Sequence, residues 1–304
     1  DYYELCKQHL TPDGIVCQWA PLHMFSEPTA RMVVRSFVEV FPNATLWEGS
    51  VDDYLLVGSP GATKVDKARI LEYARTFEKP LRQIGIEDGY DMMALFKRGP
   101  NALHSYAATG LTITDNFPHL EYADSLFPPV SELRQNDLSQ LQSTITGLEE
   151  KELATVFQRS KTLDLLQQFR YAADPAEESI GFLARYHWAR EVQKVYPSSP
   201  YVETILEYSP DRLQYFEARA KSDKGLAEFV LRLLLAKQYA RAEALLKDKL
   251  TAQNQQSTLF LLAGLIAREQ GQPSQQYFQE VLKRTSNEAA RKFLESQFQD
   301  HPPK

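Results

Sequence analysis

The sequence predicts an α/β region followed by an all-α region. Within the first sixty residues, segments with helical spacing of apolar residues alternate with short apolar runs that are typical of buried strands. From about residue 133 the strand patterns disappear, and Leu, Ala, Gln, Glu, Lys and Arg dominate, as they do in helices. We therefore expect a partial α/β domain over residues 1–128 and a helical domain over residues 133–304.

The first sixty residues predict the order helix, strand, helix, strand, strand. Residues 1–10 have helical spacing on a face made of Tyr2, Leu5, Cys6 and Leu10. The turn at 11–14 leads into a strand over 15–22, and Ser26, a good N-cap, begins the second helix. Its expected buried stripe is Ala30, Val33, Val34, Phe37 and Phe41. Strands follow over 45–48 and 54–58, and they form a hairpin.

The next seventy residues are less regular. Helical patterns occur over 64–78, 90–98 and 103–108. Residues 114–122 have the polar composition of a loop, and the pair Pro128-Pro129 marks the predicted domain boundary.

A degenerate repeat occurs near the end of the chain. Residues 237–242 lie about 34 positions before residues 271–276, and each segment separates two apolar helices. A 34-residue helix–turn–helix period predicts tetratricopeptide-like stacked helix pairs. The second copy has Gly264 and Gly271 where the first has Val230 and Lys237, so a plain helical bundle is the alternative.

Composition excludes several classes of protein. A net charge of −6 gives no global case for nucleic-acid binding. No apolar run approaches the ~20 residues of a membrane span. Cys6 and Cys17 predict buried free thiols rather than a disulfide framework or a metal site. No residues have the spacing of a Ser-His-Asp triad, a phosphate-binding loop or a zinc site.

The opening helix has no start signal and no strand before it. An α/β layout needs preceding strands to pair with the strand at 15–22. We therefore expect that the sequence lacks the N-terminal half of a domain, the half that usually carries the cofactor site.

Three stretches carry a family resemblance: YYELCKQHLTPDGIVCQWAPL at 2–22, FVEVFPNATLW at 37–47 closed by LLVGS at 55–59, and TDNFPHLEY at 114–122. Together they resemble the C-terminal part of the spermidine-synthase-like proteins, which are aminopropyltransferase relatives with the class I methyltransferase fold. That fold ends with strand 5, a helix, and strands 6 and 7 as an antiparallel hairpin, which is the order predicted here.

The resemblance implies an activity for the intact protein. It would transfer an aminopropyl group from decarboxylated S-adenosylmethionine to a diamine. The family's glycine-rich donor loop and catalytic aspartates belong to the first half of the fold, and this sequence has no such loop near its N-terminus. We therefore expect this fragment to be inactive and to bind no cofactor by itself.

The resemblance also bears on location and on acceptor. Many relatives carry an N-terminal membrane region, and some carry a helical-repeat tail. The chain is then expected to be cytoplasmic, or the soluble domain of a membrane-anchored protein. We expect the residues that select the donor to precede this sequence. The sequence therefore fits aminopropyl transfer and methyl transfer equally.

Five residues are candidates for binding the polyamine or other small amine. Gln18 and Trp19 lie near the carboxyl end of the predicted strand, where ligands of open α/β sheets bind; packing at the strand end is the alternative. Asp115, Asn116 and Glu121 lie in the third stretch. Carboxylates there would pair with ammonium groups or take the amine's proton, and the alternative is a turn or a helix cap.

A different class of function remains open. Stacked helix pairs create surfaces suited to peptides or partner domains. The helical domain would then be an interaction scaffold, attached to a degenerate, non-catalytic methyltransferase-like region.

Overall fold

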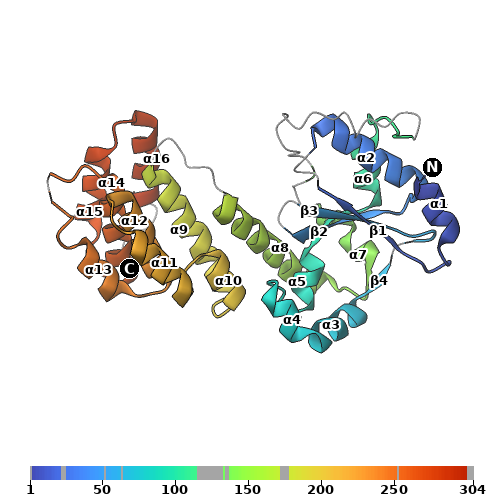
Figure 1. Ribbon diagram of the computed structural model, residues 1–304, viewed down its shortest axis with the longest axis horizontal. Coiled ribbons are helices and arrows are strands. Elements are labelled where there is room, and N and C mark those ends of the chain that lie inside the picture. The colour runs from blue at the N-terminus through green and yellow to red at the C-terminus, as the bar shows by residue number, and fades with distance from the viewer. Residues whose placement is uncertain are drawn as a thin grey trace. The chain divides into compact units, whose positions relative to one another are not determined.

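The computed structural model describes residues 2–21, 25–50, 53–62, 64–114, 133, 137–171, 178–251 and 253–299. These residues form a mixed α/β structure (Figure 1). The chain divides into two compact units: unit 1 comprises residues 1–81 and 86–161, and unit 2 comprises residues 82–85 and 162–304.

The first part of unit 1 has the element order that the sequence predicted. The elements are α1 (Tyr2–His9), β1 (Val16–Ala20), α2 (Glu27–Val40), β2 (Thr45–Ser50) and β3 (Asp53–Gly58). Ser26 caps α2 by accepting a hydrogen bond from the Thr29 N–H at 3.3 Å. The predicted stripe of α2 is confirmed, since all five of its residues are buried.

The rest of unit 1 contains short helices and strands. They are β4 (Val65–Asp66), α3 (Lys67–Thr76), α4 (Glu78–Gln83), α5 (Gly89–Ala94), β5 (Phe96–Arg98), α6 (Pro100–Ala107), the 3₁₀ helix η3 (Leu138–Gln140), α7 (Leu141–Thr144) and β6 (Ile145–Thr146). The long helix α8 (Glu150–Tyr171) begins in unit 1 and continues into unit 2.

Four strands form an antiparallel sheet in the order β1-β3-β2-β5. One face of the sheet carries Ala20, Leu46, Tyr54 and Leu56, all nearly inaccessible to solvent. This face packs with α2 and α6, which lie on the same side of the strands in Figure 1. The largest hydrophobic cluster of unit 1 therefore lies on this side of the sheet.

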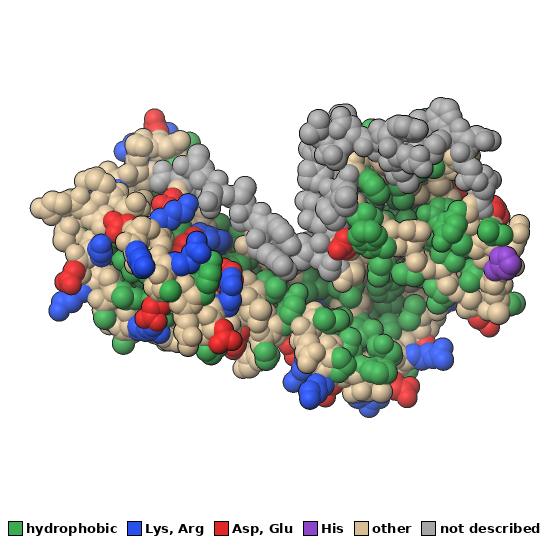
Figure 2. All heavy atoms as spheres, in the orientation of Figure 1, with side chains coloured by type: hydrophobic (Ala, Val, Ile, Leu, Met, Phe, Trp, Pro, Cys, Tyr) green, Lys and Arg blue, Asp and Glu red, His purple; other side chains and the backbone are tan. Residues whose placement is uncertain are grey.

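The opposite face of the sheet becomes more exposed toward β1. One cross-strand row on this face runs through Trp19, Leu55, Trp47 and Phe96. Phe96 is fully buried, Trp47 and Leu55 are half-buried, and Trp19 is 54% exposed. Figure 2 shows hydrophobic side chains gathered over unit 1 on the face turned to the viewer.

The structure differs from the sequence prediction at Cys17 and in α1. Cys17 was expected to be buried, but it is exposed because its side chain points to the uncovered face of the edge strand β1. In α1, Tyr2 and Leu5 of the predicted apolar face are 64% and 54% exposed. The helix instead packs through Tyr3, whose ring centroid lies 5.0 Å from that of Phe37.

Residues 90–98 were predicted to be one helix, but α5 ends at Ala94 and β5 follows. Pairing with β2 accounts for the change, because it places Lys97 beside Glu48. Their side chains form an ion pair at 2.7 Å with exposures of only 2% and 3%. Sheet pairing and charge compensation thus outweigh the local helical pattern.

A two-stranded parallel sheet, β4 with β6, joins residues near position 65 to residues near position 145. The sequence predicted no strand after residue 133, and a strand as short as β6 is too brief to leave a pattern. Glu152 at the start of α8 reinforces the connection by binding Lys67 at 2.8 Å and Tyr90 at 2.7 Å. These contacts place residues 137–161 in unit 1, whereas the predicted boundary lay between 128 and 133.

Unit 2 is helical throughout its described residues. Its helices after α8 are α9 (Glu178–Val195), α10 (Pro200–Ile205), α11 (Pro210–Arg219), α12 (Asp223–Leu235), α13 (Tyr239–Leu246), α14 (Ser257–Glu269), α15 (Gln275–Arg284) and α16 (Glu288–Gln299). The apolar faces of α9, α12 and α14 meet in its core. Among all described residues, no helix combines the length and apolar character needed to cross a membrane.

In three helix pairs of unit 2, α10 with α11, α12 with α13 and α14 with α15, the same kind of turn joins the two helices. Glu207, Lys237 and Gly271 follow α10, α12 and α14, and have positive φ angles of 60°, 59° and 70°. After α12 the Gln238 N–H donates to the Leu233 carbonyl at 2.8 Å, and after α14 the Gln272 N–H donates in the same way to the Ala267 carbonyl. These are left-handed helix caps of the Schellman type.

We expect the Lys97→Met substitution to destabilise the protein by about 3–5 kcal/mol, because it breaks a buried ion pair and removes the Lys97 charge that compensates the Glu48 carboxylate. The double variant Glu48→Leu with Lys97→Met should lose much less. Arg35→Met is the matched control, because Arg35 and Glu39 form an exposed pair on α2; it should cost under about 1 kcal/mol. Urea unfolding measures the stability of all three variants. Equal losses for Lys97→Met and Arg35→Met would contradict the stabilising role of the buried pair.

We expect Lys237→Gly to stabilise the protein by about 0.5–1 kcal/mol, since glycine adopts a positive φ without the steric cost of a side chain. Gly271→Ala should destabilise it by about 1 kcal/mol. Glu207→Gly should also destabilise, because the Glu207 carboxylate binds Arg232 at 2.7 Å. Thermal unfolding distinguishes these outcomes, and a destabilising Lys237→Gly would disprove the shared turn.

Candidate functional site

The candidate site of unit 1 lies at the carboxyl end of β1, where Gln18 and Trp19 were predicted to bind an amine. The structure confirms their position near the strand end but places their side chains on opposite faces of the sheet, because side chains alternate along a strand. The Gln18 amide donates a hydrogen bond to the Trp19 carbonyl at 2.7 Å. Trp19 is the one that projects onto the uncovered face.

Trp19 has a partner that the sequence reasoning missed. Its indole N–H donates to the Asp53 carboxylate at 3.1 Å. Asp53 precedes the strand predicted over 54–58, and in the structure it is the first residue of β3. Antiparallel pairing of β1 with β3 brings the start of one strand to the end of the other. The sequence analysis predicted the strand that becomes β3 but did not pair it with β1. That pairing would have placed Asp53 near Trp19.

The remaining three candidates, Asp115, Asn116 and Glu121, lie outside the described residues. The segment that precedes them is fixed along α2. The Thr112 hydroxyl donates to Glu39 at 2.7 Å, and the Ile113 N–H donates to the Ser36 hydroxyl at 2.7 Å. Hydrogen bonding to Thr112 lowers the pKa of Glu39, and Arg35 lowers it further against the effect of partial burial.

The pairing of Trp19 with Asp53 has a definite chemical capacity. An indole face attracts a cation that approaches within about 6 Å of the ring. An ionised carboxylate has about four acceptor sites, and the Trp19 indole N–H takes one of those of Asp53. Together the two side chains suit a ligand that carries an ammonium group on an apolar stem.

A cavity of unit 1 lies apart from the end of β1. Unit 1 has a cavity of about 430 Å³, but α3, α4, α5 and the loop before α5 line it, not the end of β1. Within the described ranges, no three His, Cys, Asp or Glu side chains are arranged to hold a metal. The contact between Trp19 and Asp53 is therefore separate from this cavity.

Comparisons with protein-family models, curated proteins and solved structures find no match for this chain.

We expect Cys17, on the same face as Trp19, to react with a maleimide in the native protein. Partial burial of its thiol raises the pKa of Cys17, so the rate should keep rising above pH ~8.5, the usual thiol pKa. The variant Cys6→Ser isolates Cys17, and Cys17→Ser leaves only the half-buried Cys6 as a control. Labelling of Cys17 only after denaturation would show that this face is covered in solution.

Proposed function

We propose that unit 1 belongs to a spermidine-synthase-like domain and that the end of β1 holds the amine acceptor of an aminopropyl transfer. The observation that carries the proposal is the contact between the Trp19 indole and the Asp53 carboxylate at 3.1 Å. It combines an aromatic face with a negative charge at the carboxyl end of a strand, where open α/β sheets bind ligands.

The order of the elements supports the same assignment. The resemblance implies a strand, a helix and an antiparallel hairpin at the close of a class I methyltransferase fold, and β1, α2, β2 and β3 have this order. β1 lies at one end of the sheet order. We propose that it is strand 5 of that fold, with β2 and β3 as strands 6 and 7.

The residues that would act on the amine have separate roles. Asp53 would pair with an ammonium group of the diamine, and the Trp19 ring would pack against its alkyl stem. Asp115 and Glu121 stay candidates for accepting the proton that the attacking nitrogen loses. The donor named by the resemblance, decarboxylated S-adenosylmethionine, is assigned no binding residue in this chain.

We also propose that the helix pairs of unit 2 are tetratricopeptide-like. Support comes from the equivalent turns at Lys237 and Gly271, which share one hydrogen-bond pattern. Their separation along the chain matches the period of such repeats, roughly 34 residues. The turn at Glu207 lies nearer to Lys237 than Lys237 does to Gly271, so the first pair is shorter.

We expect 1,4-diaminobutane to shift the NMR signal of the Trp19 indole N–H, identified as the signal lost in Trp19→Phe. The dissociation constant should be near ~1 mM, because a single half-buried carboxylate near the surface supplies little affinity. Asp53→Asn should abolish the shift. Asp13→Asn is the matched control, since Asp13 is an exposed carboxylate that precedes β1 at its other end.

Two results would overturn the proposal. One is an equal response of the Trp19 and Trp188 signals, since Trp188 lies in α9 of unit 2. The other is an equal effect of the two aspartate variants. Calorimetry with methylthioadenosine provides a further check, because tight binding would contradict the assignment of amine chemistry alone.

A further inference from the structure

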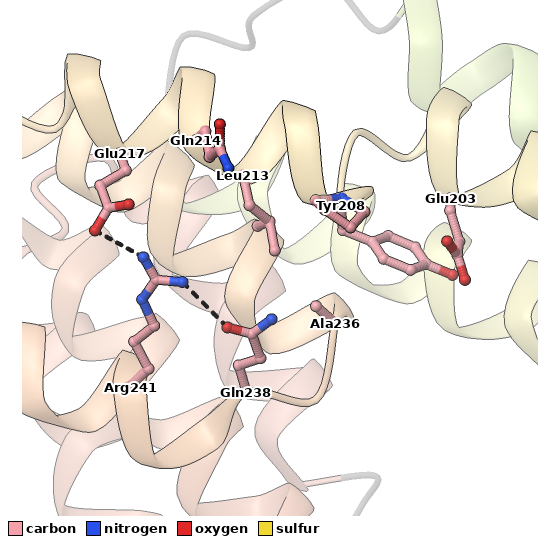
Figure 3. A pocket seen from close by; sticks show the side chains of 9 residues that line it. Glu203, Tyr208, Leu213, Gln214, Glu217, Ala236, Gln238 and Arg241 are labelled. Carbon is pink, nitrogen blue, oxygen red and sulfur yellow. Dashed lines mark hydrogen bonds and ion pairs between the residues drawn. The ribbon is translucent and has the colours of Figure 1, made fainter.

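A groove in unit 2 combines an uncompensated carboxylate with an aromatic ring. It has a volume of about 480 Å³, within the range of small-ligand sites. Its walls come from α10, α11, α13 and the two left-handed turns after α10 and α12 (Figure 3). The groove lies wholly within unit 2 and is independent of the transfer proposed for unit 1.

One side of the groove is acidic and aromatic. Figure 3 shows the Tyr208 hydroxyl beside the carboxylate of Glu203. Burial raises the pKa of Tyr208, a hydrogen bond with Gln193 opposes this, and the negative charge of Glu203 raises it again. The phenol is therefore neutral at physiological pH. Glu203 has no ion-pair partner within the part of the chain that the structure describes.

The other side of the groove carries charges that are already paired. Arg241 binds Glu217 at 2.7 Å and donates to the Gln238 side chain at 3.3 Å. The charged residues of the whole lining are Glu203, Glu217 and Arg241, so its net charge is −1. Leu213 projects between the two sides in Figure 3 and supplies an apolar surface. The groove thus favours a cation with an apolar stem and disfavours an anion.

The next helix pair has an equivalent groove with a different charge. Its volume is about 440 Å³, and its lining includes Ala240, Glu243, Ala244 and Lys247. These four have the same spacing along the chain as four lining residues of the first groove: Pro210, Leu213, Gln214 and Glu217. Lys247 replaces Glu217 and balances Glu243, so the second groove has no net charge. The shape comes from the repeated helix pair, while the charge is particular to the first groove.

We propose that the groove formed by Glu203, Tyr208 and Leu213 binds a primary ammonium group on an alkyl stem, as presented by a lysine side chain of a partner peptide. Glu203 would pair with the ammonium group, Tyr208 would offer its ring to the charge, and Leu213 would contact the methylenes. A free diamine carries the same chemistry, and the test separates the two sources.

The test uses the full chain and a fluorescein-labelled peptide, Ala-Leu-Lys-Leu-Ala, followed by fluorescence polarisation. A second peptide has norleucine in place of lysine, which keeps most of the alkyl stem and removes the charge. We expect the lysine peptide to bind at least about fivefold more tightly, and its affinity to fall as salt is added. Equal binding of both peptides, or no binding of either peptide or of 1,4-diaminobutane, would overturn the proposal.

Two substitutions locate the binding. Glu203→Gln should weaken the lysine peptide about tenfold, the loss expected for one charge-assisted hydrogen bond. Glu243→Gln is the matched control, because Glu243 lines the neutral groove and is exposed; it should have no effect. Equal losses for both variants would overturn the assignment. If circular dichroism shows that Glu203→Gln does not fold, Tyr208→Leu replaces it and should weaken binding severalfold.

Competition with 1,4-diaminobutane identifies the source of the ammonium group. Persistence of the peptide complex in excess diamine supports a peptide ligand. If the diamine displaces the peptide from the native protein but not from the Glu203→Gln variant, the ammonium site is the same and its ligand is a small amine. Displacement that the Glu203→Gln variant leaves unchanged would place the amine elsewhere and overturn the inference.

Discussion

Burial of one face of the sheet by α2 is the interaction on which unit 1 depends. Phe37 of α2 and Phe41, which caps the end of α2, are fully buried, and each contributes about 1.5–3 kcal/mol through removal of its ring from water. Gly58 of β3 permits this contact, because a Cβ atom at that position would lie 2.7 Å from Phe41. β3 is also the strand that pairs with both β1 and β2. The packing of α2 therefore sets the position of the strand end that carries Asp53.

Unit 2 depends on a different constraint, the left-handed residue that ends a helix and allows the next to fold back. Glycine meets this requirement at position 271 without cost, whereas Glu207 and Lys237 bear side chains there. Glu207 offsets the strain through Arg232, a buried residue whose guanidinium also lies 4.3 Å above the Phe216 ring. Because the turn backbone is the same in each case, side chains vary around it while the helix pairs keep their form.

The sequence was sufficient for elements whose own periodicity matches their final packing. The stripe of α2 and the order of the first five elements belong to this kind. It was insufficient where distant pairing decides the structure. Residues 96–98 are a strand because β2 accepts them, and Lys97 is buried because Glu48 compensates it. Asp53 reaches Trp19 only through the register between β1 and β3. Exposure of Cys17 likewise depends on which face of the sheet is covered, and alternation alone does not reveal that.

The two grooves of unit 2 have similar volumes and differ in the charge of their linings. Residues 210, 213, 214 and 217 on α11 occupy the places that residues 240, 243, 244 and 247 occupy on α13 and just beyond its end. The charges differ because Lys247 stands where the first groove has Glu217, and because Glu203 lines only the first groove. Electrostatic complementarity of this kind governs selection among partners more than it governs total affinity. A stack of similar helix pairs can thus present differently charged grooves without altering the packing that holds the stack together.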